Sequence, residues 1–229
     1  MTKYQHLRNK SVGSKLREVV FGMEDGMVST LGAISGIAIG SQDHFTVVLS
    51  GTVIIAVESI SMSIGSYLSN RSEHEVNLGR IEEEKEEIRD FPGQEHQELL
   101  QLFIRDGWPS KLANDMAETA LKDPDLMLKE MKYRELLIPQ DSTNKAFQHG
   151  ILMYVSYVIG GLIPLAAYFF LPIKSAMPIS VIATLIGLFG IGAFTTKYSR
   201  VTWYKAGVRV LLLGVVALVV GYLVGELLS

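Results

Sequence analysis

The sequence predicts an all-α integral membrane protein with five transmembrane helices and a cytoplasmic helical insertion between the second and the third. Three observations support this. The chain is 48% hydrophobic, although 20% of its 229 residues are charged. The charge is concentrated, since 18 of the 24 acidic residues and 11 of the 21 basic residues lie within 70–145. Outside that segment lie five apolar stretches of about 20 residues or more, long enough to cross a hydrocarbon core about 30 Å thick.

The predicted spans follow one another in a simple order. They are 19–41, 45–69, 146–171, 177–196 and 206–228. The polar turn at 42–45 is short, so the first two spans should run antiparallel beside each other. The chain then divides into three parts: 1–69 with a basic arm and two spans, 70–145 with the insertion, and 146–229 with three spans.

Basic residues predict the orientation. They gather in the N-terminal arm, the insertion and the loop 197–209, whereas Lys174 is the one Lys or Arg in the two remaining loops. Because positively charged loops stay in the cytoplasm, we expect a cytoplasmic N-terminus and insertion. Membrane lipid is then a partner, and the short arm without targeting features favours a prokaryotic protein of the cell (plasma) membrane. The acidic insertion has the wrong sign for nucleic acid, so no nucleic-acid partner is expected.

Small residues mark where the spans pack. Gly32, Gly36 and Gly40 form a ladder in the first span, and Gly221 and Gly225 form another in the fifth. Such ladders let helix backbones approach closely in a membrane. Packing within one chain is favoured over a dimer seam.

The insertion is predicted to be helical throughout. Its expected helices are 72–90, 94–105, 109–121 and 124–137, separated by turn-forming FPGQ, DGWPS and KDPD. Its expected apolar core is Leu99, Leu102, Phe103, Leu112, Met116, Leu121, Leu126 and Leu128.

Two acids interrupt the first span. Glu24 and Asp25 lie in the stretch FGMEDGMVS, where a carboxylate is costly unless it faces a polar interior, water or a cation. Asp25 is seven residues from Glu18 and therefore shares its helix face, whereas Glu24 points about 100° away. Asp25 is thus the candidate ligand and Glu24 the bystander.

The second span carries a third acid. Glu58 and Met62 are one helical turn apart on the same face. A carboxylate with a thioether suits a borderline cation such as Fe²⁺, Mn²⁺ or Co²⁺. A lone methionine more often fills a core, and the neighbouring acids are what favour a site here.

Glutamates recur with helical spacing in the insertion. Glu84 and Glu87 form one E-x-x-E pair, Glu95 and Glu98 form another, and Glu135 lies one turn beyond Met131. Two such pairs on separate helices can converge on a divalent cation. The competing interpretation of the run EEEKEE is a solvated helix face with ion pairs to its own basic residues.

Three motifs in order resemble those of the vacuolar iron transporter (VIT/CCC) family. They are EVVFGMEDGMVSTLGAISG, SISMSIGSYLS and SYVIGGLIPLAAY, and the similarity extends over nearly the whole chain. It implies a proton-coupled antiporter that exports Fe²⁺, often also Mn²⁺, from the cytosol and works as a homodimer. It implies no enzyme activity and no prosthetic group, because the metal is cargo.

The resemblance also implies roles for individual residues. Glu18 corresponds to the acid at the cytoplasmic mouth, Asp25 to the translocation carboxylate and Met62 to the second-helix methionine. The metal ligands of the insertion would be Glu84, Glu87, Glu95, Glu98, Met131 and Glu135.

Two positions depart from the family pattern. Glu58 stands where a small residue is usual, while Ile54 replaces an acid one turn earlier, so Glu58 is added to the predicted pathway. Lys132 stands where a methionine would be. Two other function classes remain open from the residues: a membrane metal sensor or scaffold that does not transport, and a membrane-tethered ferroxidase, although no E-x-x-H motif occurs in the insertion.

Overall fold

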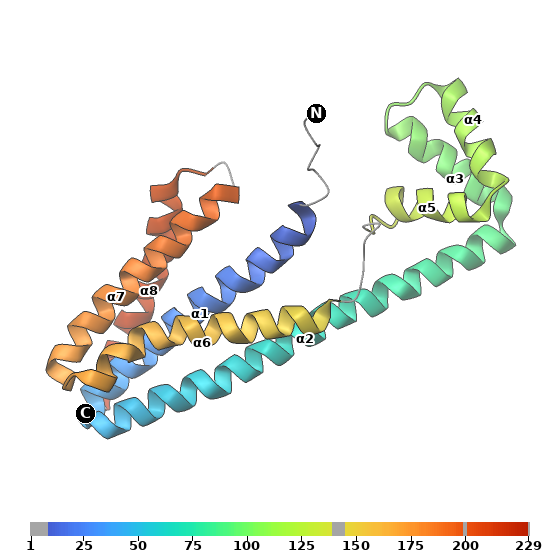
Figure 1. The fold of residues 1–229 in the computed structure, drawn as a ribbon. Helices are drawn as coiled ribbons and strands as arrows, with labels where there is room; N and C mark the ends of the chain where they lie inside the picture. The colour runs from blue at the N-terminus through green and yellow to red at the C-terminus, as the bar shows by residue number, and fades with distance from the viewer. Residues whose placement is uncertain (1–8, 139–144, 199–200, 229) are drawn as a thin grey trace, which may run out of the picture. The chain divides into compact units, whose positions relative to one another are not determined.

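The computed structural model describes residues 9–138, 145–198 and 201–228, and the regular structure there is helical. The helices are α1 (Asn9–Ser41), α2 (His44–Asp90), α3 (Pro92–Arg105), α4 (Ser110–Leu121), α5 (Pro124–Arg134), α6 (Ala146–Phe170), α7 (Ile173–Thr195) and α8 (Trp203–Leu227) (Figure 1). They form two compact units, one from 1–68 with 146–229 and the other from 69–145.

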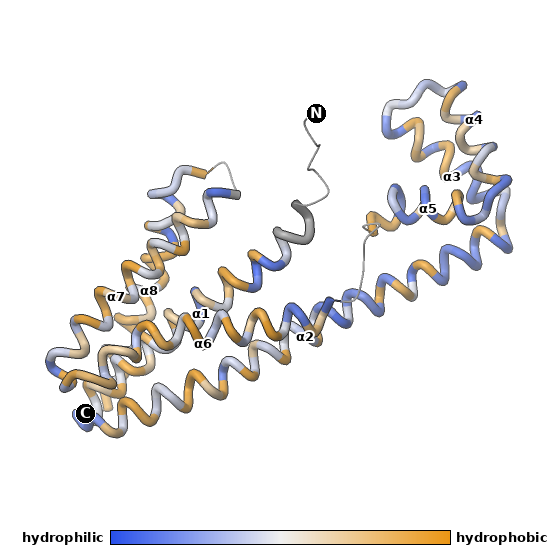
Figure 2. The backbone as a smooth tube through the Cα atoms, viewed as in Figure 1, coloured by the Kyte–Doolittle hydropathy of each residue, from blue (hydrophilic) through white to orange (hydrophobic). Residues whose placement is uncertain are grey.

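Four of the described helices, α2, α6, α7 and α8, are long and apolar enough to cross a membrane. Figure 2 shows that α2 is mostly hydrophobic in its first part and mostly hydrophilic in its last. Helix α1 contains the predicted first span but is not among the four, because its acids and small residues lower its mean hydropathy. An all-α, multi-pass membrane protein is therefore confirmed, while the fifth span stays a prediction.

In the unit with the apolar helices, α1 packs against α6, α7 and α8. The two glycine ladders meet each other: a Cβ added at Gly36 would lie 2.6 Å from the carbonyl oxygen of Gly221, and one at Gly32 would lie 3.0 Å from that of Ala217. Small residues are thus needed on both helices, and the expected packing within the chain is confirmed.

Helix α2 joins this unit at several points along its apolar part. Val47 and Ile55 are buried with Ile34 and Leu165 in one apolar cluster. At its start, the Asp43 carboxylate accepts hydrogen bonds from the backbone N–H (2.8 Å) and hydroxyl (2.6 Å) of Thr46 and caps the helix. Further along, the Ser63 hydroxyl donates to the carbonyl of Gly150 at 2.9 Å.

The boundary between the second span and the insertion differs from the expectation. Separate helices at 45–69 and 72–90 were expected, but α2 runs without interruption from His44 to Asp90. The stretch 69–78 contains neither glycine nor proline. An ion pair from Arg71 to Glu75, one turn on, at 2.7 Å adds modest local support.

The unit 69–145 folds around its own apolar core. The core consists of Leu99, Leu102, Phe103, Ala113, Ala117, Ala120, Met127 and Met131. Leu112 and Leu121, which were expected in it, are 43% and 41% exposed. Helix α4 turns its alanine face inward instead, because small side chains let it pack closely against its neighbours.

Candidate metal sites

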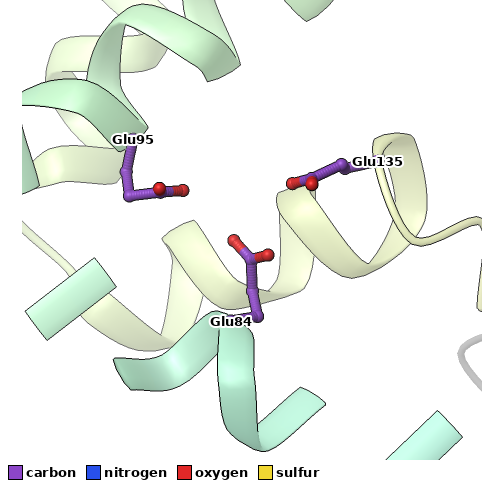
Figure 3. A group of neighbouring side chains, drawn as sticks. All are labelled: Glu84, Glu95 and Glu135. Atoms are coloured by element: carbon purple, nitrogen blue, oxygen red, sulfur yellow. The ribbon is translucent and has the colours of Figure 1, made fainter. Parts of the chain in front are cut away.

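Three glutamates converge in the unit 69–145 (Figure 3). Glu84 comes from α2, Glu95 from the first turn of α3 and Glu135 from the C-terminal cap of α5. One carboxylate oxygen from each lies within 4.8 Å of the other two. The chain achieves this by ending α2 at Asp90 and restarting at Pro92, a residue that favours the first position of a helix.

Two of the three carboxylates are buried, and each has an oxygen without a hydrogen-bond partner among the described residues. Glu84 is 2% exposed and Glu95 is 6% exposed. In the described part of the chain, neither Oε1 of Glu84 nor Oε2 of Glu95 has a hydrogen-bond partner. A buried, unpartnered oxygen costs free energy, so the arrangement calls for a proton or a cation.

Electrostatics lead to the same conclusion. Burial, reinforced by repulsion from Glu135 and Glu95, raises the pKa of Glu84 to about 8. Burial also raises the pKa of Glu95 and of Glu135, and the nearby charge of Glu98 adds to both shifts. A divalent cation would replace the proton that this cluster otherwise holds, since a ligand carboxylate must be deprotonated.

The remaining predicted ligands of the insertion lie around this cluster. Glu87 and Glu98 are exposed, and their charges act on the buried glutamates. Met131 is fully buried within the apolar core. The basic residues nearby pair elsewhere: Lys85 with Glu82 and Arg89 with Asp90, both at 2.8 Å. Part of the acidic run is therefore a solvated face, as the competing interpretation held, but Glu84 is not.

The acids of the apolar helices form a second cluster. Asp25 on α1 and Glu58 on α2 are half-buried and interact electrostatically. The hydroxyl of Tyr157 on α6 donates to Glu58, and because its proton is used there, Ser29 on α1 donates to Tyr157 at 2.5 Å. Tyr157 is fully buried, and through these two hydrogen bonds it links α6 to α2 and to α1 beside Glu58.

Backbones approach closely beside Asp25. A Cβ at Gly26 would lie 2.9 Å from the backbone nitrogen of Gly161 on α6, so Gly26 permits the contact of α1 with α6 at that level. Met62 is half-buried one turn from Glu58 on α2. The structure thus relates Asp25 to Glu58, while the role of Met62 stays a prediction.

Comparison with known proteins identifies the relationship. The model of the VIT family matches residues 16–226. The chain belongs to the VIT family. Among similar proteins, a "Vacuolar iron transporter 1" of Tulipa gesneriana is 26% identical over 90% of this chain and 84% of its own length. A "Vacuolar iron transporter" of Plasmodium berghei is 26% identical over 93% and 82%, and a "Vacuolar iron transporter 1" of Oryza sativa subsp. japonica is 27% identical over 94% and 86%.

Members of the VIT family are transporters and not enzymes, so the ferroxidase alternative is set aside.

The family match begins at residue 16 and therefore includes Glu18, which is 3% exposed. Glu18 accepts hydrogen bonds from Ser66 on α2 at 2.9 Å and from Arg17 at 3.0 Å. His149 on α6 approaches it at 3.6 Å.

Sequence reasoning did not single out His149. The quoted motifs contain Ser29, Ser66 and Tyr157, but their contacts with the acids were not predicted. The available signal was a polar side chain inside an apolar run, which predicts a satisfied partner or a functional role but does not say which.

Proposed function

We propose that this VIT-family protein is a proton-coupled antiporter that exports divalent iron, manganese or both from the cytosol. The observation that carries the proposal is the convergence of Glu84, Glu95 and Glu135, in which Glu84 and Glu95 each keep one buried oxygen without a partner among the described residues. Oxygen ligands of this kind bind Fe²⁺ and Mn²⁺. The relatives named vacuolar iron transporters support iron as a cargo.

In this mechanism the cytosolic insertion captures the metal. The ion then passes Glu18 at the cytoplasmic mouth and is held by Asp25 and Met62, with Glu58 as the second carboxylate. Protons arriving from the opposite side neutralise the same carboxylates and release the ion, because protons and metal compete for one set of oxygens.

The proposal includes a topology. Helix α1 supplies a fifth span, supported by its close packing against α6, α7 and α8. The three parts of the chain are then 1–69, 70–145 and 146–229, with the N-terminus and insertion cytoplasmic. We place the protein in the cell membrane, although its relatives are named for the vacuole, and propose a homodimer.

Purified protein in liposomes tests this function. An acidic lumen should accelerate uptake of Fe²⁺ or Mn²⁺, reported by a metal-sensitive dye inside, and uptake should alkalinise the lumen. A proton ionophore should abolish accumulation. Uptake at the same rate with and without the proton gradient would contradict antiport.

The same assay separates transport from sensing. Because the unit 69–145 has its own core and its own glutamate cluster, metal could bind there without crossing the membrane. Binding by the full-length protein with no flux under any gradient would favour the sensor or scaffold.

A further inference from the structure

A histidine lies against the buried acid at one end of the apolar helices. His149 is 7% exposed, and Glu18 is 3% exposed. The Nδ1 atom of His149 lies 3.6 Å from Oε1 of Glu18, and within the described residues this nitrogen has no hydrogen-bond partner. The two side chains come from helices α6 and α1, so their approach results from the packing of these helices.

The separation is too long for a hydrogen bond and suits a shared cation. Nitrogen–oxygen hydrogen bonds in proteins span about 2.7–3.2 Å. Two ligand atoms each about 2.1 Å from one metal ion lie about 3.0–3.4 Å apart, depending on whether the geometry is octahedral or tetrahedral. A shift of a few tenths of an ångström would therefore bring Nδ1 and Oε1 onto one ion.

Neighbouring groups hold both side chains in place. The hydroxyl of Ser66 donates to the other carboxylate oxygen of Glu18, Oε2, at 2.9 Å. The backbone next to His149 is fixed, because Ser63 donates to the carbonyl of Gly150. Arg17 also donates to Oε1 at 3.0 Å, but its side chain is 67% exposed, so it can leave as a cation arrives.

We propose that His149 and Glu18 form a transient binding site for a divalent first-row transition-metal ion. The inference rests on the proposed transport function and adds a residue that selects the cargo. Carboxylates bind Mg²⁺ and Ca²⁺ as well as Fe²⁺ and Mn²⁺, whereas an imidazole nitrogen adds affinity for first-row transition metals, more for Fe²⁺ than for Mn²⁺. Two protein ligands, with water completing the shell, give a weak site, as passage requires.

Pulsed EPR of Mn²⁺ on the full-length chain tests the site directly. Glu95→Gln with Glu135→Gln weakens the cluster of the insertion, so that bound Mn²⁺ reports on other sites. Echo modulation from a coordinated nitrogen is expected in this background and should disappear with His149→Phe, which keeps a ring but has no ligand atom. His149→Asn is the second variant in case the first does not fold, and His74→Gln is the matched control that retains the modulation.

In transport, loss of His149 is expected to weaken discrimination between Mn²⁺ and Mg²⁺. His149→Phe should raise the KM for Mn²⁺ about tenfold, the lower end of what a metal site loses when its ligand environment is damaged. Inhibition of Mn²⁺ uptake by Mg²⁺ should rise with it. Nitrogen modulation that persists without His149, or that is absent from the background protein, would overturn the site. If the background protein shows the nitrogen modulation but the unsubstituted protein shows no flux, the transport proposal fails while the metal site stands.

Discussion

The two carboxylate clusters of this protein differ in what satisfies their oxygens. In the unit 69–145, Glu84 and Glu95 each keep a buried oxygen without a donor among the described residues. Among the apolar helices, Glu58 receives a hydrogen bond from Tyr157, which is itself held by Ser29. The cluster of Glu84, Glu95 and Glu135 therefore has carboxylate oxygens that are unpartnered in the described part of the chain, whereas Glu58 has a neutral hydrogen-bond donor, the hydroxyl of Tyr157.

This contrast suits two different tasks. A cluster of three acids with two buried oxygens that lack partners among the described residues is most stable when a cation fills it, which favours capture and retention. A carboxylate with a hydroxyl partner tolerates the absence of a cation, which a pathway residue must do between transport cycles. Variants in each cluster test whether one captures the metal ion and the other serves its passage across the membrane.

The largest effect is expected for Asp25→Asn. The amide keeps the size of the side chain but cannot supply a charged ligand oxygen, so flux of Mn²⁺ in liposomes should fall about a hundredfold. Metal binding to the insertion should not change, because Asp25 lies in the other unit. Glu24→Gln is the matched control and should transport like the parent, since it changes the neighbouring acid in the same helix. Equal flux from Asp25→Asn and the parent would remove Asp25 from the pathway.

The next effect concerns capture. Glu95→Gln should lower the affinity of the full-length protein for Mn²⁺ about tenfold or more, because one of three converging oxygens becomes a neutral amide. Flux should fall at low metal concentration and recover at high concentration, as expected when capture and not passage is damaged. Glu83→Gln, on the exposed face of α2, should leave the affinity unchanged. A loss of flux at saturating metal would show that the two tasks are not separate.

The sequence was sufficient for the helical class and for several of the acids that the structure brings together. Hydropathy predicted the apolar helices, and i,i+3 spacing singled out Glu84 and Glu95 as candidate ligands. Spacing also noted Glu135, one turn beyond Met131, and Glu18, on the helix face of Asp25, but their roles came from the resemblance to a family. Burial then distinguished Glu84 from the solvated acids around it, which spacing could not do.

Features that depend on helix rotation could not be predicted. The rotation of α6 about its own axis determines whether Tyr157 contacts Glu58 on α2 or faces lipid, and no local sequence pattern predicts that rotation. The continuity of α2 was missed for a related reason, since the absence of a breaker between span and insertion is a weak signal. The alanine face of α4 was missed because hydrophobicity favours leucine, whereas close helix packing favours small side chains.

A smaller effect should follow from Tyr157→Phe. This change removes the donor to Glu58 and leaves the ring in place, which costs about 0.5–1.5 kcal/mol for a typical hydrogen bond. Flux should therefore fall about fivefold, with no change in the affinity of the insertion for metal. Tyr168→Phe is the matched control, because the buried hydroxyl of Tyr168 has no partner in the described residues. Its loss should leave the flux unchanged. Equal behaviour of the two variants would mean that the Tyr157 hydroxyl does not tune Glu58.

The smallest effect expected is a dependence of stability on pH in the metal-free insertion. The pKa of Glu84 is about 8 in the folded protein against an ordinary value of 4.5, so the folded state holds this proton more tightly than the unfolded chain does. The stabilisation is complete below pH 4.5 and is lost as the pH rises towards 8. The chain has two tryptophans, so a Trp203→Phe background leaves Trp108, at the end of α3, as the reporter of this unit.

In that background the unfolding midpoint of the metal-free unit should fall by about 5 °C between pH 5 and pH 8. Saturating Mn²⁺ should reverse the trend, because metal binding releases the proton that the cluster holds and therefore strengthens as the pH rises. Glu84→Gln should make the metal-free profile shallower, since the amide does not titrate while Glu95 and Glu135 still do, and Glu83→Gln should leave its slope intact. A metal-free midpoint that rises with pH would mean that the cluster is already satisfied when empty, and the contrast between the two clusters would then disappear.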